Sequence, residues 1–291
     1  MSAAKSMPAA GTRKIASKRR PPVKPGERLW QLFTGLGIAG LGWWYYTAHR
    51  QPSPNRYHGL VLALGWIGIA TAVLAAMLSA RKRIAYQGAG RVSVWLTAHV
   101  YLGILSAFAI LFHSGFGAGG PLSTWLLAFF SLTVVSGLMG WWFSRTLPPL
   151  LTQMEEHPAI MEDLLLVRAE CLQGMLELAA GGSPEFRALV ERGLIKDASS
   201  WTGMFRFYRR RSTVAQELPA FQKEHAGELS SLKRQEQLAF QRAIEYALRV
   251  NKMNAEILLQ RTMRGWLTFH IVCTGTMFGL AAIHIFTQLY Y

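Results

Sequence analysis

The chain has 291 residues, of which 51% are hydrophobic, yet its formal net charge is +15. Of the 16 acidic residues, 15 lie between Arg145 and Arg264, so the rest of the chain has basic clusters between apolar runs. This uneven distribution excludes an ordinary soluble domain. The basic residues mark the ends of these runs rather than one folded face, which argues against nucleic-acid binding. This pattern is typical of a protein embedded in a lipid bilayer.

The two cysteines, Cys171 and Cys273, exclude several kinds of metal site. No CxxC or CxxCH motif occurs, so a cysteine-based zinc site, an iron–sulfur cluster and a covalently attached c-type haem are not expected within this chain. Cys273 lies in an apolar run and Cys171 in a polar region, and we expect no disulfide between them.

The N-terminal segment, residues 1–28, is rich in Lys and Arg and contains Pro21, Pro22 and Pro25, and we expect a disordered basic tail. A cleaved signal peptide or an organelle transit peptide is the alternative. A membrane-spanning helix needs about 20 mostly apolar residues. Five stretches meet this requirement, at about 29–48, 59–79, 93–113, 122–143 and 266–289. The fold class predicted is therefore an all-α membrane protein with five transmembrane helices, four in residues 29–144 and the last in residues 265–291.

The basic residues also predict an orientation. The N-terminal tail and the 80–92 loop are strongly positive, whereas the 114–121 loop carries no charge. Since cytoplasmic segments collect Lys and Arg, we expect the N-terminus in the cytoplasm and the C-terminus outside, in a bacterial inner membrane.

Residues 145–264 then form a cytoplasmic insert, which we expect to be helical. Pro148-Pro149 is expected to end the fourth span, and Gly181–Pro184 to separate two helices. No Gly or Pro occurs from Glu228 to Arg264, and this predicts one long helix that continues into the last span. Its predicted inner face follows a spacing of three or four, namely Phe240, Ile244, Leu248, Asn251, Ala255 and Leu258. Trp201–Arg211 is interpreted as an interfacial segment on anionic headgroups, with a docking site as the alternative.

Four histidines carry the predicted chemistry. The third span contains His99 and His113, the fifth contains His270 and His284, and both pairs follow the pattern H-x13-H. This spacing returns to within about 40° of the same helix face and covers about 21 Å along the axis. The third and fifth spans run parallel, so His99 and His270 share one level of the membrane, and His113 and His284 share the other.

Two facing imidazoles at each level can clamp one haem iron, so we predict two non-covalent b-type haems. A structural hydrogen bond or a proton path is the alternative for any single intramembrane histidine. Copper or zinc would need three or four ligands that converge, which this spacing prevents. Gly103, Gly275 and Gly279 lie between the two levels, where they would admit a flat macrocycle or serve helix packing.

The remaining charged and histidine positions have weaker signals. Arg91 and Arg264 precede the inner histidines and are candidate partners of haem propionates, although anchoring at the membrane surface explains them equally well. His49 and His58 flank the outer 48–58 loop, where we expect interfacial solvation, with contact to haem propionates or to a quinone as the alternative. We assign no role to His157 and His225.

The paired H-x13-H spacing, the segment HVYLGILSAFAILFHSGF and the segment VVSGLMGWWFSR resemble the bacterial bis-haem membrane cytochromes b. This group lies within a wider set that includes the cytochrome b of quinol-oxidising complexes and the ferric-reductase-like transmembrane domains. The resemblance covers mainly residues 92–146 and 262–288, and it implies haem ligation by the four histidines. The long insert departs from the quinol-oxidising cytochromes, so their quinone pockets are not carried over.

The expected function is electron transfer across the membrane, as the membrane subunit of a respiratory quinol-linked oxidoreductase. No glycine-rich dinucleotide fingerprint follows a strand, so the redox partner would be a quinone or another subunit, such as a cytochrome c, an iron–sulfur protein or a flavoprotein. The alternatives are a stand-alone quinone or ferric reductase and a haem-free membrane scaffold whose insert recruits a partner.

Overall fold

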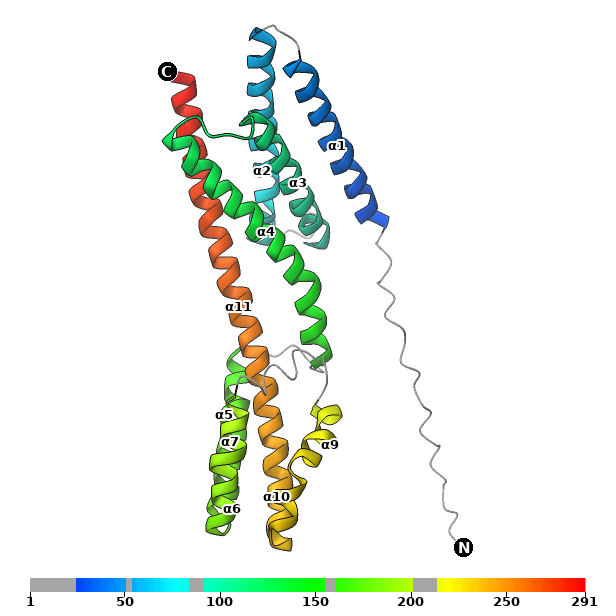
Figure 1. Cartoon of the computed structure of the whole chain (residues 1–291), viewed down its shortest axis with the longest axis vertical. Helices are drawn as coiled ribbons and strands as arrows, with labels where there is room; N and C mark the ends of the chain where they lie inside the picture. Colours follow the sequence, from blue (N-terminus) through cyan, green and yellow to red (C-terminus); the bar gives the residue numbers. More distant parts are fainter. Residues whose placement is uncertain (1–24, 51–53, 84–91, 155–160, 201–213, 291) are drawn as a thin grey trace, which may run out of the picture. The chain divides into compact units, whose positions relative to one another are not determined.

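The computed structural model describes residues 25–50, 54–83, 92–154, 161–200 and 214–290, and the statements below concern these ranges. All the regular elements in them are helical, which confirms the all-α prediction. The chain divides into two compact units, residues 1–113 and residues 114–291, and each is described by itself (Figure 1).

The first unit consists of three helices: α1 (Pro25–His49), α2 (Pro54–Arg83) and α3 (Val92–His113). Helices α2 and α3 form its main packing contact and run antiparallel, with Ala75 beside His99 and Val61 beside His113. Between these two levels the buried Ser106 hydroxyl donates a hydrogen bond to the main-chain carbonyl of Gly68 (2.8 Å). Small residues on α2 therefore allow α3 to approach the α2 backbone closely.

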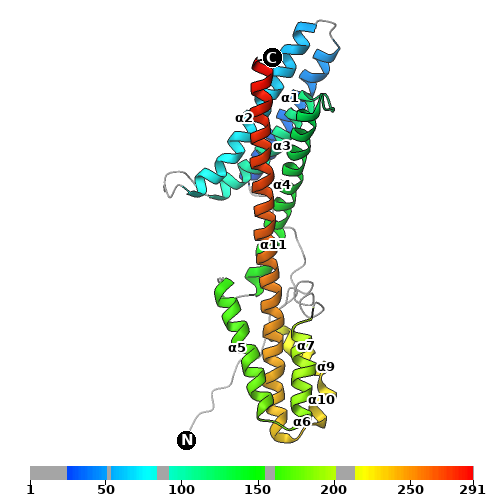
Figure 2. The same ribbon diagram turned by 90° about the vertical axis from the view of Figure 1, so that its left-hand side faces the viewer.

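Helix α1 packs along α3 and runs parallel to it. Trp30 stacks on Tyr101 with ring centroids 6.4 Å apart, and Tyr45 stacks on Phe112 at 5.3 Å. Between these stacks, a Cβ atom added to Gly37 would lie 3.0 Å from the Leu105 side chain. Residues 30–45 of α1 therefore follow residues 101–112 of α3 side by side (Figures 1 and 2).

The second unit is organised by α11 (Arg234–Tyr290), a helix of 57 residues. At 1.5 Å per residue it is about 86 Å long, far more than the roughly 30 Å of a hydrocarbon core. Its C-terminal half packs antiparallel against α4 (Pro121–Met154), with Phe143 and Trp266 in an edge-to-face contact. Its N-terminal half packs against the helices of the insert (Figure 2).

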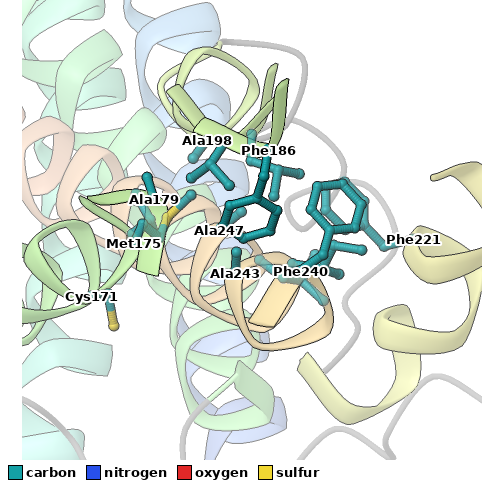
Figure 3. Close-up of a cluster of buried hydrophobic side chains, with 14 of the residues drawn as sticks. Cys171, Met175, Ala179, Phe186, Ala198, Phe221, Phe240, Ala243 and Ala247 are labelled. Carbon is teal, nitrogen blue, oxygen red and sulfur yellow. The ribbon is translucent and has the colours of Figure 1, made fainter. Parts of the chain in front are cut away.

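The insert has a hydrophobic core of its own. Its helices are α5 (Met161–Ala180), α6 (Pro184–Ala188), the π-helix η2 (Leu189–Leu194), α7 (Ile195–Ala198), α9 (Val214–Glu224) and α10 (Ala226–Ser231). Buried side chains from α5, α6, α9 and α11 meet there, among them Met175, Phe186, Phe221 and Phe240 (Figure 3). The described part of the insert is therefore helical, as the sequence predicted, and its helices pack on the N-terminal half of α11.

The long-helix prediction is confirmed with different ends. Helix α11 begins at Arg234 rather than at Glu228. Glu228 belongs instead to the preceding helix α10, which ends at Ser231. All the positions predicted for its inner face are buried except Leu258, which is 39% exposed. The fourth span ends before Pro148-Pro149, as predicted, since its apolar stretch runs from Pro121 to Thr146, but the helix itself continues to Met154. The basic tail before Pro25 and the Trp201–Arg211 segment lie outside the described residues.

Four helices of the described chain are long and apolar enough to cross a membrane: His58–Ser79 of α2, Ser93–His113 of α3, Pro121–Thr146 of α4, and α11. These match four of the five predicted spans. Helix α1 forms where the first span was expected, but its five glycines and its aromatic and polar residues keep it outside this set by composition. Apolar side chains on these helices are widely exposed, as expected of surfaces that face lipid.

Candidate haem-binding histidines

The two histidines of α3 have matching environments. The ring Nδ1 of His99 lies 2.9 Å from the main-chain oxygen of Ala75, and Nδ1 of His113 lies 2.7 Å from that of Val61. Ala75 and Val61 have the same separation along α2 as the two histidines have along α3. Both rings therefore point to α2, which confirms that the H-x13-H spacing places them on one helix face.

These hydrogen bonds fix the chemistry of the two rings. A carbonyl oxygen only accepts, so Nδ1 of each ring must be the N–H donor. A neutral imidazole with its proton on Nδ1 carries its lone pair on Nε2, the atom that would bind iron. Hydrogen bonding of this kind orients a ligating histidine and raises its basicity.

Gly65 brings the ring of His113 onto the α2 backbone. A Cβ atom at this position would lie 2.9 Å from both Cε1 and Nδ1 of His113. One turn further along α2, a Cβ atom on Gly68 would lie 2.5 Å from the Ile110 side chain. The two glycines thus set how closely α3 approaches α2, and any larger residue at Gly65 would displace the His113 ring.

On α11, His270 is held by α4. The buried hydroxyl of Ser136 lies 2.8 Å from Nδ1 of His270 and also donates to the main-chain carbonyl of Thr133 (3.0 Å). With the Ser136 proton on the Thr133 carbonyl, the Ser136 oxygen can accept the proton of His270 Nδ1. This arrangement gives His270 the same tautomer as the two histidines of α3.

Trp266 completes this cluster. Its ring stacks on His270 with centroids 5.8 Å apart, and its Nε1 donates to the main-chain carbonyl of Ser136 (2.8 Å). Gly140 makes room for it, since a Cβ atom there would lie 1.8 Å from the Trp266 ring. The Ser136–Gly140 stretch of α4 therefore positions both rings.

Aromatic and basic residues at this end of α4 and α11 are typical of a membrane–water boundary. The Arg145 guanidinium lies 4.5 Å from the ring centroid of Trp141, and Trp142 is exposed nearby in the sequence. His270 follows Arg264 by six residues, or about 9 Å of helix, and His284 lies about 21 Å further along. His284 is half-buried near the other end of the apolar part of α11.

The glycines expected between the two histidine levels have open space beside them within the described chain. No described atom comes within 4 Å of a Cβ atom built on Gly103, Gly275 or Gly279. The helix-packing role suggested for small residues belongs instead to Gly65, Gly68 and Gly140, which the sequence pattern did not single out. Gly68 and Gly140 each lie one turn from a polar residue within an apolar span, Thr71 and Ser136, a signal that Gly65 lacks.

The other candidate residues lie away from these clusters. Arg91 and His157 are outside the described residues. Arg264 is exposed on α11, and His58 is exposed near the start of α2. His49 is exposed at the end of α1, where it stacks on Tyr45. None of these described positions brings a further charged group into the histidine clusters.

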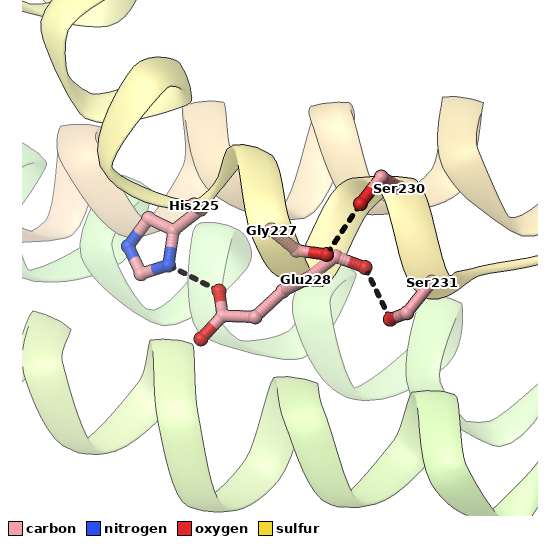
Figure 4. Close-up of polar contacts among 5 residues, drawn as sticks. All are labelled: His225, Gly227, Glu228, Ser230 and Ser231. Atoms are coloured by element: carbon pink, nitrogen blue, oxygen red, sulfur yellow. Dashed lines mark hydrogen bonds and ion pairs between the residues drawn. The ribbon is translucent and has the colours of Figure 1, made fainter.

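His225 has a structural environment that its sequence position did not predict. It is 9% exposed at the α9–α10 junction, with its ring edge-to-face against Phe221 and Phe240. Its Nδ1 pairs with the Glu228 carboxylate, and its buried Nε2 has no hydrogen-bond partner among the described residues (Figure 4). The ring thus belongs to the apolar core of the insert, with one polar edge at its surface.

The donor set of the four histidines suits a group that needs one ligand on each side. Within the described residues, no three His, Cys, Asp or Glu side chains converge on one point. Two histidines of one helix, about 21 Å apart, cannot share one metal ion. Each could instead bind a haem iron through Nε2, with the second ligand supplied by a different helix.

In comparisons with known proteins, the chain matched no protein-family model, no curated sequence and no solved structure. The structural class shown by the described part of the chain is that of an all-helical protein with four helices long and apolar enough to span a membrane.

Proposed function

We propose that this chain is an integral membrane cytochrome of the b type, which holds two non-covalent haems and carries electrons across the bacterial inner membrane. His99 and His270 would ligate the haem nearer the cytoplasm, and His113 and His284 the outer one. A haem bound in this way supplies a one-electron redox couple, while the chain supplies its ligands, their orientation and an apolar surrounding.

The observation that carries this proposal is the repeated hydrogen bonding of α3 to α2. Two histidines with the H-x13-H spacing meet two carbonyls of equal spacing, and both rings are held as the tautomer with the lone pair on Nε2. A histidine with only a structural role would not require a second histidine with the same contact at the same spacing. His270 reaches the same tautomer through a different acceptor, the Ser136 hydroxyl, which extends the pattern to a second helix.

The proposed partners are molecules that could exchange electrons with a haem on either face of the membrane. The chain would serve as the membrane subunit of a quinol-linked respiratory oxidoreductase, with a quinone, a cytochrome c, an iron–sulfur protein or a flavoprotein as redox partner. The packed insert offers a surface for such a subunit. Arg264 stays a candidate partner of a haem propionate, because it is exposed about 9 Å from the level of His270.

The test is a reduced-minus-oxidised absorption spectrum with haem quantification on the detergent-purified protein. We expect two non-covalent b haems per chain, and one after His113→Ala or His284→Ala. His49→Ala is the matched control, because it removes an exposed histidine at a helix end and should keep both haems. A folded wild-type protein without haem would favour the scaffold alternative, in which the same histidine variants leave complex assembly intact.

A further inference from the structure

We propose that Ser136 is a positioning residue for His270, and that its hydroxyl lowers the reduction potential of the haem that His270 holds. This inference rests on the proposed function, but it concerns a residue on α4, a helix that provides no ligand. The hydroxyl lies 2.8 Å from Nδ1 of His270, and Ser136 is 2% exposed, so no solvent competes for the contact.

We assign the direction of the hydrogen bond from a third group, the Thr133 carbonyl. Ser136 Oγ donates to the Thr133 carbonyl of its own helix (3.0 Å), which leaves the oxygen lone pairs to accept the Nδ1 proton of His270. The main-chain carbonyl of Ser136 accepts from Trp266 Nε1, and the Trp266 ring lies at 19° to that of His270. One residue of α4 thus fixes the proton position of the ligand and the aromatic ring that stacks on it.

The contact differs in kind from those of the α3 histidines. His99 and His113 donate to main-chain carbonyls, which no side-chain substitution removes. His270 donates to a side-chain hydroxyl, so its hydrogen bond can be removed without changing the ligand. A hydrogen bond from Nδ1–H raises the basicity of Nε2, and a more basic ligand favours ferric over ferrous iron. Loss of the hydroxyl should therefore raise one of the two haem potentials and leave the other unchanged.

The experiment is a potentiometric titration of the purified protein, with haem quantification, for the wild type, Ser136→Ala and Ser136→Cys. In Ser136→Ala we expect the ferric–ferrous equilibrium of one haem to shift about tenfold toward ferrous iron, or about 59 mV for one electron. Ser136→Cys should fall between wild type and alanine, because sulfur is a weaker acceptor of similar size. Thr133→Val is the matched control, since the Thr133 hydroxyl bonds to the Phe129 carbonyl of its own helix and its loss should leave both potentials unchanged.

The outcomes separate this inference from the proposed function. A wild-type protein without haem overturns both. Two haems in every variant, with potentials in Ser136→Ala equal to those of the wild type, overturn only the role of Ser136. If Ser136→Ala loses a haem, Ser136→Cys decides: two haems with one raised potential support the inference, and two unchanged potentials overturn it. An equal shift in Thr133→Val would also overturn it, because any loss of a hydroxyl from α4 would then have the same effect.

Discussion

At the scale of single residues, the spans depend on glycines that admit an aromatic ring. Gly140 and Gly137 lie three residues apart on α4 and both face α11, but they differ in the space beside them. A Cβ atom on Gly140 would lie 1.8 Å from the Trp266 ring, whereas one on Gly137 would lie 3.6 Å from His270 Cε1, an ordinary contact. The same substitution should therefore have different effects at the two positions.

We predict that Gly140→Ala destabilises the α4–α11 pair by about 1–3 kcal/mol, because the rigid Trp266 ring must move and its hydrogen bond to Ser136 is lost. Gly137→Ala is the matched control and should be nearly neutral. Thermal unfolding of both variants in the same detergent measures the difference. Equal melting temperatures for the two variants would show that Trp266 does not pack on Gly140.

The residues around the histidines differ in how far a sequence can predict them. The spacing of His99 and His113 was enough to predict their common face, because helix geometry is regular. Their acceptors, the carbonyls of Ala75 and Val61, could not be predicted, because every residue has a carbonyl and only the packing of α2 on α3 selects two of them. Ser136 lies in the VVSGLMG segment already singled out, but nothing in that segment shows which way its hydroxyl points.

At the scale of elements, the insert owes its cohesion to α11, whose inner face was largely predicted from the spacing of apolar residues. Polar contacts join the shorter helices to it in ways that no local pattern shows. The Asn254 side chain donates to the Ala198 carbonyl at the end of α7 (2.9 Å) and accepts from Arg168 of α5 (2.7 Å). With its amide nitrogen turned to the same carbonyl, Asn251 donates to it at 2.8 Å. These amides hydrogen-bond to a main-chain carbonyl at the end of α7, which would otherwise be buried without a hydrogen-bond partner.

A second polar contact joins the start of α6 to the start of α11, and it predicts a pH dependence. The main-chain N–H of Ser183, the N-cap residue of α6, donates to the Glu236 carboxylate (2.8 Å), and this hydrogen bond holds the pKa of Glu236 below its ordinary value of 4.5. A carboxyl whose pKa is lowered by folding stabilises the fold above its unfolded pKa. That contribution is lost as the pH falls through the folded value.

We therefore expect the protection factor for hydrogen exchange at the start of α6, measured relative to the intrinsic exchange rate at each pH, to fall below about pH 4.5 in the wild type. Glu236→Gln should show faster exchange at neutral pH and a weaker acid response, because its amide oxygen accepts without charge. Glu185→Gln is a suitable control, since it alters a carboxyl of α6 that has no such contact with α11 among the hydrogen bonds described. The same acid response in Glu236→Gln as in the wild type would assign it to another group.

At the scale of the whole molecule, the placement of α1 decides whether the bundle has four spans or five. Its 25 residues are about 37 Å long, enough for a hydrocarbon core of about 30 Å, although its composition keeps it outside the set of apolar spans. The packing of α1 is stronger evidence for a fifth span than its composition is evidence against one. Residues 30–45 of α1 follow residues 101–112 of α3, and α3 is long and apolar enough to span.

The exposed side of α1 also favours a membrane-spanning position. Leu32, Leu36 and Trp43 are 63%, 73% and 68% exposed, and water is a poor solvent for such a surface. The Trp43 and Tyr46 ring centroids lie 6.1 Å apart near its C-terminal end, where the Arg50 guanidinium lies 4.5 Å from the Tyr46 ring centroid. Aromatic residues next to an arginine are typical of an interfacial belt. We therefore expect α1 to cross the bilayer beside α3.

The placement of α1 decides on which side of the membrane the N-terminus lies, while the insert is expected in the cytoplasm in either case. If α1 spans, the N-terminus and the insert share the cytoplasmic side, and the C-terminus lies outside. If α1 does not span, the N-terminus moves to the outer side, while the insert and the C-terminus stay where they are. A reporter that fluoresces only in the cytoplasm should therefore be active at the N-terminus, and alkaline phosphatase, active only outside, should be active after Tyr291. Phosphatase activity from a fusion at the N-terminus would show that the basic tail lies on the outer face. The chain would then have four spans rather than five.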